Sequence, residues 1–383
     1  MRQFGFKAAL LTILFILILI ISLLSSPDVI YAANNGPDSE VSISNGILTV
    51  YIESKTGYDG VGTYTICTGP NHPVPSQDIL QFGVDGDAWT SYNTIHVLNE
   101  TIGIRGDYVT ESDSSIVPYP GFSLGILDEV SPSIIKLTLT RMVIQWIMPE
   151  GLNITQDIEV LGLTAADTYA RITMTVKNNN GTYSYGVGIR YLWDLKVACT
   201  DGSWLRTINP TSNWLDTEHA WYQPSFEHWE ATDDPANPTL IVCGSITEPS
   251  LLSPQPTRPD NFTFATWGRT PLGLYDNAWN FTIDSNRKIA GFSDADSAVA
   301  YYWGPRTLAP GGEISVTAYI WVLTPRPVGG FIVDSAPLGD WAAGSAHWHI
   351  LGLILTASCI LLLAALRIFR RYKAVSRWLK AGI

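Results

Sequence analysis

Polar and apolar residues alternate in several parts of the chain with a period of two, which is the pattern of a half-buried β-strand. The clearest alternation covers residues 170–177, and residues 313–322 repeat it after a Pro-Gly-Gly turn. Residues 185–191 follow the turn-forming residues 178–181, so we predict that the two flanking runs form a β-hairpin. The long apolar-rich run at 133–147 predicts one or two further strands.

No stretch between residues 40 and 325 shows a comparable helical period, and turn signals recur throughout it. Strands separated by regular turns are typical of antiparallel sandwiches. No linker rich in Ser or Pro divides this region. We therefore predict an all-β fold: a large antiparallel β-sandwich of the super-sandwich type over residues 34–325.

Both ends of the chain are apolar. The first follows Arg2 and Lys7 and leads to small residues near 32–33, which predicts a signal peptide over residues 1–33, with an uncleaved N-terminal anchor as the alternative. The second predicts a transmembrane helix at 342–366, preceded by a juxtamembrane linker at 326–341 and followed by a basic cytoplasmic tail at 367–383. The expected location is the cell membrane, with a single span, the sandwich outside and the C-terminus in the cytoplasm.

Charge separates the two sides of that membrane. Residues 34–349 hold 34 acidic and 15 basic side chains, whereas the tail holds six basic side chains and no acidic one. An acidic ectodomain lacks the basic surface that phosphate binding needs, so nucleic acid is excluded as a partner. The basic tail is expected to lie on the anionic inner leaflet or to act only as a stop-transfer signal.

Three segments resemble a known family. Residues 169–178, 188–194 and 308–313 are similar to the strands and turns of galactose-mutarotase-like sandwiches, and the resemblance extends over about residues 157–323. Such domains occur in sugar epimerases, in glycoside-processing enzymes and as non-catalytic modules. The epimerases use a histidine and a carboxylate in the concave sheet. No histidine of this chain aligns with that motif, so the resemblance implies no catalytic residue here.

Candidate chemistry is concentrated between residues 193 and 234, where aromatic and acidic side chains alternate. Sugars bind through the packing of a ring face on indole and through hydrogen bonds from hydroxyls to carboxylates. We predict carbohydrate-binding roles for Trp204, Trp214, Trp221 and Trp229. The alternative is that these side chains fill the core of a large sandwich, because tryptophan is well buried on average.

Catalysis by two carboxylates is a further hypothesis. A glycosidase needs two acids across the scissile bond, and Asp194 and Glu227 are the pair to test, although no motif singles them out. A Gly-x-Ser-x-Gly sequence occurs at residues 121–125, but no helical pattern follows it, so the strand–turn–helix elbow of a serine hydrolase is not supported. An enzyme is therefore less favoured than a binding protein.

Two kinds of segment in the sequence contain side chains that can bind metal ions. His219 and His228, near Glu218, Glu227 and Glu230, contain donors for a transition metal, although their spacing fits no helical motif. Two short acidic turns, one with Asp85 and Asp87 and one with Asp294 and Asp296, could each supply oxygens to Ca²⁺. Both turns fall short of a full ligand set. We thus predict no cofactor, with Ca²⁺ as a candidate ion.

Covalent modification follows from the extracellular placement. Three of the four cysteines lie outside the predicted span, and we predict a disulfide between Cys199 and Cys243, with three buried free thiols as the alternative. Glycosylation sequons begin at Asn99, Asn153, Asn180, Asn261 and Asn280.

These patterns together favour a membrane-anchored extracellular protein for recognition or cell-envelope structure that faces carbohydrate. A membrane-anchored carbohydrate-active enzyme is the alternative, and an accessory subunit of a membrane complex is the second alternative.

Overall fold

The structure, a computed structural model, describes residues 40–57, 60–247, 252–268 and 273–323. These residues all belong to one compact unit. They form two large sheets in which nearly all neighbouring strands are antiparallel, and β6 with β7 is the parallel pair. Within the described residues, the one helical element is the short 3-10 turn η1 (Leu127–Val130). The predicted all-β class is confirmed.

The larger sheet has eleven strands, in the order β1-β2-β3-β4-β12-β18-β17-β14, with β5, β6 and β7 branching from β12. Its strands are β1 (Glu40–Ser44), β2 (Leu48–Glu53), β3 (Tyr64–Thr68), β4 (Asp78–Leu80), β5 (Asn93–Asn99), β6 (Ile104–Val109), β7 (Ser123–Ile126), β12 (Tyr185–Ala198), β14 (His219–Tyr222), β17 (Asn261–Thr266) and β18 (Ser297–Leu308).

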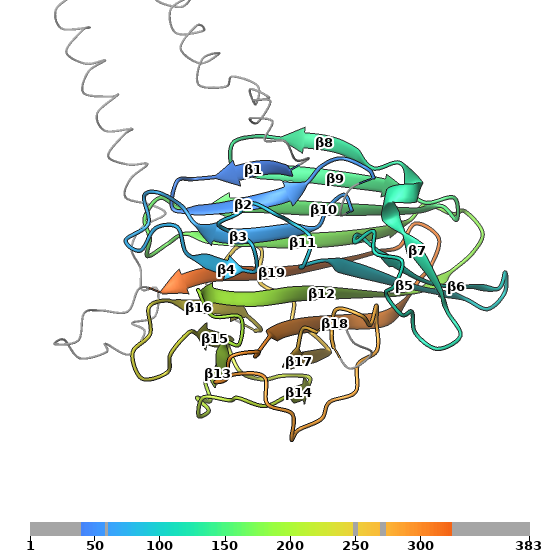
Figure 1. Cartoon of the computed structure of the whole chain (residues 1–383). Helices are drawn as coiled ribbons and strands as arrows, with labels where there is room; N and C mark the ends of the chain where they lie inside the picture. The colour runs from blue at the N-terminus through green and yellow to red at the C-terminus, as the bar shows by residue number, and fades with distance from the viewer. Residues whose placement is uncertain (1–39, 58–59, 248–251, 269–272, 324–383) are drawn as a thin grey trace, which may run out of the picture. The chain divides into compact units, whose positions relative to one another are not determined.

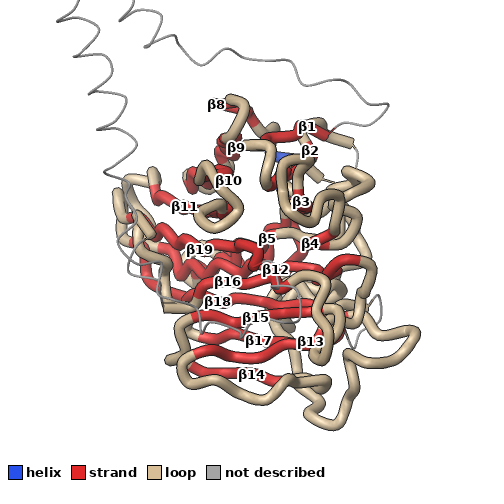
Figure 2. Tube along the Cα trace, turned by 90° about the vertical axis from the view of Figure 1, so that its left-hand side faces the viewer, coloured by secondary structure: helices blue, strands red, loops and turns tan. Residues whose placement is uncertain are grey.

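The smaller sheet has eight strands, in the order β13-β15-β16-β19-β11-β10-β9-β8. Its strands are β8 (Ser133–Leu137), β9 (Arg141–Ile147), β10 (Leu152–Leu161), β11 (Tyr169–Asn178), β13 (Trp204–Ile208), β15 (His228–Thr232), β16 (Ile241–Ser245) and β19 (Glu313–Leu323). Most strands of both sheets run across the view of Figure 1, and Figure 2 shows them from the side, with the connecting loops in tan.

The main core lies between the two sheets, because the inward positions of both contribute to one cluster of buried side chains. In β11 every second residue is buried, which is the alternation that the sequence predicts, and β10 shows the same pattern. Two of the indole nitrogens in this core have hydroxyl partners: Trp193 Nε1 donates to the Tyr64 hydroxyl at 2.6 Å, and Trp229 Nε1 donates to the Tyr301 hydroxyl at 2.6 Å. The indole N–H groups of Trp193 and Trp229 are therefore both satisfied although the rings are buried.

The predicted hairpin of β11 and β12 is wrong, although both strands exist. β11 pairs with β10 and β19 in the smaller sheet, whereas β12 pairs with β4, β5 and β18 in the larger one. The turn between them crosses from one sheet to the other, and the Asn178 side chain fixes it by donating to the Tyr183 and Leu308 carbonyls. Turn-forming residues specify a reversal of the chain, but they do not specify which strands become hydrogen-bonded partners.

A second hydrophobic cluster covers the outer face of the larger sheet. Outward residues of β12 and β18, such as Leu192 and Ala300, lie under loop residues that include Trp267, Leu274 and Tyr275. The sheet is thus buried on both faces, which explains the nearly continuous burial of β12. These covering loops, between β6 and β7 and between β17 and β18, carry the pocket described below.

Among the residues that the structure describes, none belongs to a helix with the length and apolar character that a membrane span requires. The predicted signal peptide, juxtamembrane linker, transmembrane helix and basic tail lie outside the described residues.

Candidate functional site: a loop-lined pocket beside a histidine–aspartate pair

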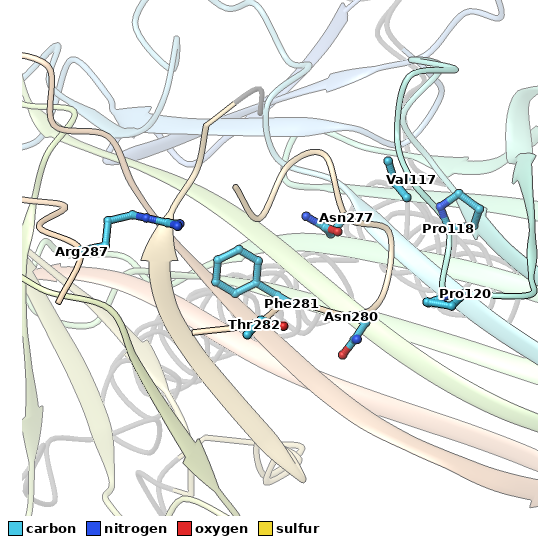
Figure 3. A pocket seen from close by; sticks show the side chains of 8 residues that line it. All are labelled: Val117, Pro118, Pro120, Asn277, Asn280, Phe281, Thr282 and Arg287. Carbon is cyan, nitrogen blue, oxygen red and sulfur yellow. The ribbon is translucent and has the colours of Figure 1, made fainter. Parts of the chain in front are cut away.

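A pocket of about 190 Å³ opens between two loops of the larger sheet. Figure 3 shows residues 117–120 on one side and residues 277–287 on the other. The lining residues are Val117, Pro118, Pro120, Asn277, Asn280, Phe281, Thr282 and Arg287. Its volume is below the roughly 300 Å³ at which sites for drug-sized ligands begin, so it suits a single small ring or a short polar group.

The two loops that line the pocket are joined by backbone hydrogen bonds. The Val117 amide donates to the Asp276 carbonyl, and the Ala278 amide donates to the Val117 carbonyl. Two prolines, Pro118 and Pro120, fix the backbone on one side of the pocket. The pocket is consequently built on a paired segment of backbone and is largely preformed.

A buried histidine–aspartate pair lies next to these loops in the fold. His96 on β5 faces Asp107 on β6, and its Nδ1 atom is 2.7 Å from Asp107 Oδ1. Asp107 is fully buried, and its other oxygen accepts the Tyr119 backbone N–H, which belongs to the pocket loop. A carboxylate oxygen accepts hydrogen bonds, so this contact places a proton on Nδ1 and, in the neutral tautomer of the ring, the lone pair on Nε2.

Aromatic rings hold the imidazole of His96 in place. Phe122 stacks on it with centroids 4.4 Å apart, and Trp279 stacks on it at 4.7 Å. Gly188, the register partner of His96 on β12, leaves the space for this tryptophan, since a Cβ there would be 2.4 Å from the Trp279 ring. Trp279 precedes the pocket residue Asn280, so the histidine pair and the pocket share the same loops.

Arg190 positions the second pocket loop from below. This side chain on β12 is fully buried, and its guanidinium donates to the Leu274 carbonyl at 2.7 Å and to the Ala278 carbonyl at 3.2 Å. It also lies over the Tyr92 and Tyr302 rings. Charge-assisted bonds to two loop carbonyls hold residues 274–278 against the sheet.

Three acids form a separate group where β12 and β18 meet. Burial, followed by the charges of Asp296 and Asp201, raises the pKa of Asp194 well above its usual range. Burial and Asp201 raise the pKa of Asp296 to about 7, and burial raises the pKa of Asp201. One carboxylate oxygen of Asp194 and one of Asp201 are buried without a hydrogen-bond partner. Burial and mutual repulsion thus favour the neutral form of these acids over a wider pH range than for exposed aspartates.

The two acids predicted as a catalytic pair do not share a site. Asp194 is buried on β12 in the group just described, whereas the partly exposed Glu227 precedes β15 and accepts a hydrogen bond from Asn209. Asp194 lies in the larger sheet, whereas Glu227 lies beside a strand of the smaller sheet. The structure therefore gives no support to a glycosidase that uses these two carboxylates.

The four predicted sugar-binding tryptophans have different surroundings. Trp229 is fully buried in the main core, so its assignment to a ligand surface is wrong. Trp221 is partly buried and packs against Phe226 and Phe262 of the same core. Trp204 and Trp214 are partly exposed, and Trp214 lies 4.5 Å from the Arg206 guanidinium. These side chains do not form one aromatic face.

The acidic turns suggested for Ca²⁺ are also separate. Asp85 and Asp294 are exposed, and Asp87 is partly exposed. Asp296 points instead toward the buried group with Asp194 and Asp201. The Ca²⁺ assignment to these turns remains a prediction.

The predicted disulfide is not formed. Cys67, Cys199 and Cys243 are free, and Cys199 is exposed while Cys243 is fully buried. Burial raises the pKa of the Cys243 thiol well above its usual range. Cys199 directly follows β12 of the larger sheet, whereas Cys243 lies in β16 of the smaller sheet. This difference explains their separation.

The sequons differ in access. The Asn99 side chain is 5% exposed and donates to the Ser184 carbonyl, and the Asn180 amide donates to the Glu150 carbonyl and the Tyr185 hydroxyl. Asn153 and Asn261 lie within strands, each with a side-chain oxygen buried without a partner. Asn280 is exposed at the pocket. Glycosylation of the folded chain therefore fits Asn280 best.

His96 and Asp107 are the residues that sequence reasoning missed. A signal was available, because a turn at residues 100–103 between two short apolar runs predicts a hairpin, and its register places residue 96 opposite residue 107.

No protein-family model matches the chain, and no curated protein matches it. Among solved structures, the chain is similar to a TPR-domain containing protein from Parabacteroides distasonis, with 10% identity, a TM-score of 0.37, and coverage of 79% of this chain and 50% of that one. It is also similar to a polysaccharide lyase, with 10% identity, a TM-score of 0.33, and coverage of 74% and 34%. The chain thus spans half the length of the first protein and about a third of the second. Scores at this level carry no argument about substrate or activity, and the galactose-mutarotase-like resemblance stays a prediction.

Proposed function

We propose that the described unit recognises carbohydrate and binds one sugar unit in the pocket between residues 117–120 and 277–287. The observation that carries this proposal is the combination of a preformed pocket with polar side chains and a stacked aromatic group beside it. Amide groups such as Asn280 both donate to and accept from sugar hydroxyls. Phe281 and the proline rings supply the apolar contacts that a sugar C–H face needs.

Isothermal titration calorimetry tests this proposal with a panel of neutral and acidic mono- and oligosaccharides. The parent chain is expected to bind at least one of them saturably, and Asn280→Ala is expected to lower its affinity about tenfold, the effect of one lost hydrogen bond. Asn213→Ala, an exposed asparagine outside the pocket, is the matched control. An absence of saturable binding across the panel, or equal affinity of Asn280→Ala and the parent, would overturn the proposal. The protein should come from a host that does not glycosylate it.

A second candidate function, a carbohydrate-active enzyme, is favoured by one specific observation. A buried aspartate fixes the tautomer of His96, which is the arrangement that prepares an imidazole for general acid–base catalysis. A reaction in which a proton is taken from, or given to, a bound sugar suits one such histidine better than it suits a pair of acids.

Proton exchange between each bound sugar and deuterated water, followed by NMR, tests this second candidate. His96→Gln and Asp107→Asn are expected to slow the exchange by about 10²–10⁴-fold. His219→Gln is the control, because that histidine lies on β14 and does not line the pocket. Sugar binding without any catalysed exchange would leave recognition as the function and exclude catalysis.

Anchoring completes the proposal. We propose that the unit faces the outside and is held near the membrane by the single span predicted at 342–366. Its acidic charge supports a carbohydrate or protein partner and opposes a nucleic acid. An accessory role in a membrane complex would appear as co-purification of a defined partner after extraction in mild detergent.

A further inference from the structure

Three different donor side chains meet on the outer face of the smaller sheet, away from the pocket. His228 and Glu230 are two residues apart on β15, so their side chains are on the same face. Cys243 on β16 is the register partner of Glu230 and lies directly opposite it. One ligand atom from each of the three residues lies within 4.8 Å of the others.

We propose that His228, Glu230 and Cys243 bind a transition-metal ion, with Zn²⁺ as the best fit. An imidazole nitrogen, a thiolate sulfur and a carboxylate oxygen together are donors for Zn²⁺ and similar ions, whereas Ca²⁺ and Mg²⁺ prefer oxygen alone. Strand geometry already holds the three donors close together, so binding requires little rearrangement. Three protein ligands leave the fourth tetrahedral position for water or an external group.

The neighbours of Glu230 support this assignment. Arg206, its register partner on β13, donates from Nε at 2.7 Å and from Nη2 at 2.5 Å, both to Oε2. The other oxygen, Oε1, is directed to the histidine and lies 3.7 Å from His228 Nε2. One oxygen of the carboxylate is thus held by a cation and the second is available to a metal, which is how outer-shell partners orient ligands.

Aromatic side chains lie on both sides of the three donor residues. The Arg206 guanidinium lies 4.5 Å from the Trp214 ring. The ring of Trp321 on β19, the register partner of Cys243, lies 5.4 Å from the His228 ring. Partly exposed rings on each side limit the access of water to the three donors and stiffen their rotamers. Trp214 therefore has a role that does not depend on sugar binding.

Cobalt titration tests the proposal, because Co²⁺ replaces Zn²⁺ in such sites and a thiolate ligand gives it a sulfur-to-metal absorption band. The full chain, purified in detergent without a histidine tag and treated with a chelator, is expected to bind about one Co²⁺ with this band, and Zn²⁺ is expected to displace it. Cys243→Ser is expected to lose the band, and His228→Gln to weaken binding by at least about 100-fold. Arg206→Gln is expected to weaken binding by about 10–100-fold.

Two controls make the test specific. Cys199→Ser removes an exposed thiol, and His219→Gln removes a histidine of the other sheet, so both variants are expected to bind Co²⁺ like the parent. Circular dichroism of each variant reports whether it folds, and His228→Gln changes a partly exposed residue. No absorption band in the parent, or a band that persists in Cys243→Ser, would overturn the proposal.

Discussion

Because three acids are buried or partly buried near the place where β12 and β18 meet, we predict that the protein loses stability as the pH rises from weakly acidic to neutral. Asp296 has an ordinary aspartate pKa of 3.8 when exposed, and burial together with Asp201 raises it to about 7 in the folded chain. Between about pH 4 and pH 7 this side chain therefore binds fewer protons in the unfolded chain than in the folded chain, and its contribution to the free energy of unfolding falls as the pH rises.

The magnitude follows from the same shift. A difference of about 3 pKa units at 1.36 kcal/mol each gives at most about 4 kcal/mol, lost across that interval and constant above it. Asp194 acts in the same direction, because burial and the same neighbours raise its pKa. Lys196, which is 3.3 Å from Asp78, offsets part of the negative charge.

Urea unfolding at several pH values, followed by tryptophan fluorescence in the presence of a chelator, measures this slope. Asp296→Asn keeps the shape of the side chain and removes its titration, so the variant is expected to show a flatter dependence and to be more stable than the parent at neutral pH. Asp294→Asn, an exposed aspartate two residues away, is the control that is expected to keep the parental slope. Stability that rises with pH over this interval, or equal slopes for Asp296→Asn and the parent, would refute the reasoning.

Four further predictions concern single residues. Gly188→Ala is expected to displace the Trp279 ring and to destabilise the fold by about 1–3 kcal/mol, measured by urea unfolding, with weaker sugar binding in calorimetry. Trp229→Phe is expected to destabilise it by about 2–4 kcal/mol, because it removes a buried hydrogen bond and leaves a cavity, again measured by urea unfolding. Arg190→Met is expected to lower protection of the 274–278 amides in hydrogen exchange, since two loop carbonyls lose their donor. A membrane-impermeant thiol reagent on intact cells is expected to label about one thiol per chain, that of the exposed Cys199, and a chain that stays unlabelled would contradict the external placement.

Local patterns in the sequence identify the strands well. The alternation at 170–177 lies within β11, the run at 313–322 lies within β19, and the run at 133–147 becomes the two strands β8 and β9. These predictions are reliable because the period of apolar residues reflects one face of a strand packed on a core. The partners of each strand depend on contacts distant in sequence, which is why the crossing between β11 and β12 could not be inferred from its turn.

The candidate site shows the limit of composition as a guide. Indole rings beside carboxylates suggested a sugar-binding face, yet Trp229 belongs to the core and Glu227 binds Asn209. A composition of this kind cannot distinguish rings that cover a core from rings that meet a ligand. The pair His96 and Asp107 was missed because each residue is unremarkable in its own strand, and only the register of β5 and β6 brings them together.

The position of β19 also has a mechanical consequence. This last described strand lies in the interior of its sheet, hydrogen-bonded to β11 on one side and β16 on the other, whereas the first strand, β1, is an edge strand paired with β2 alone. Tension applied through the chain beyond Leu323 would load the ladders on both sides of β19 in shear, so many backbone hydrogen bonds would resist it at once. Tension applied before Glu40 would be resisted by a single ladder of five residue pairs. A chain pulled from both ends is therefore expected to yield first at its N-terminal strand, while the strand nearest the proposed anchor keeps its place.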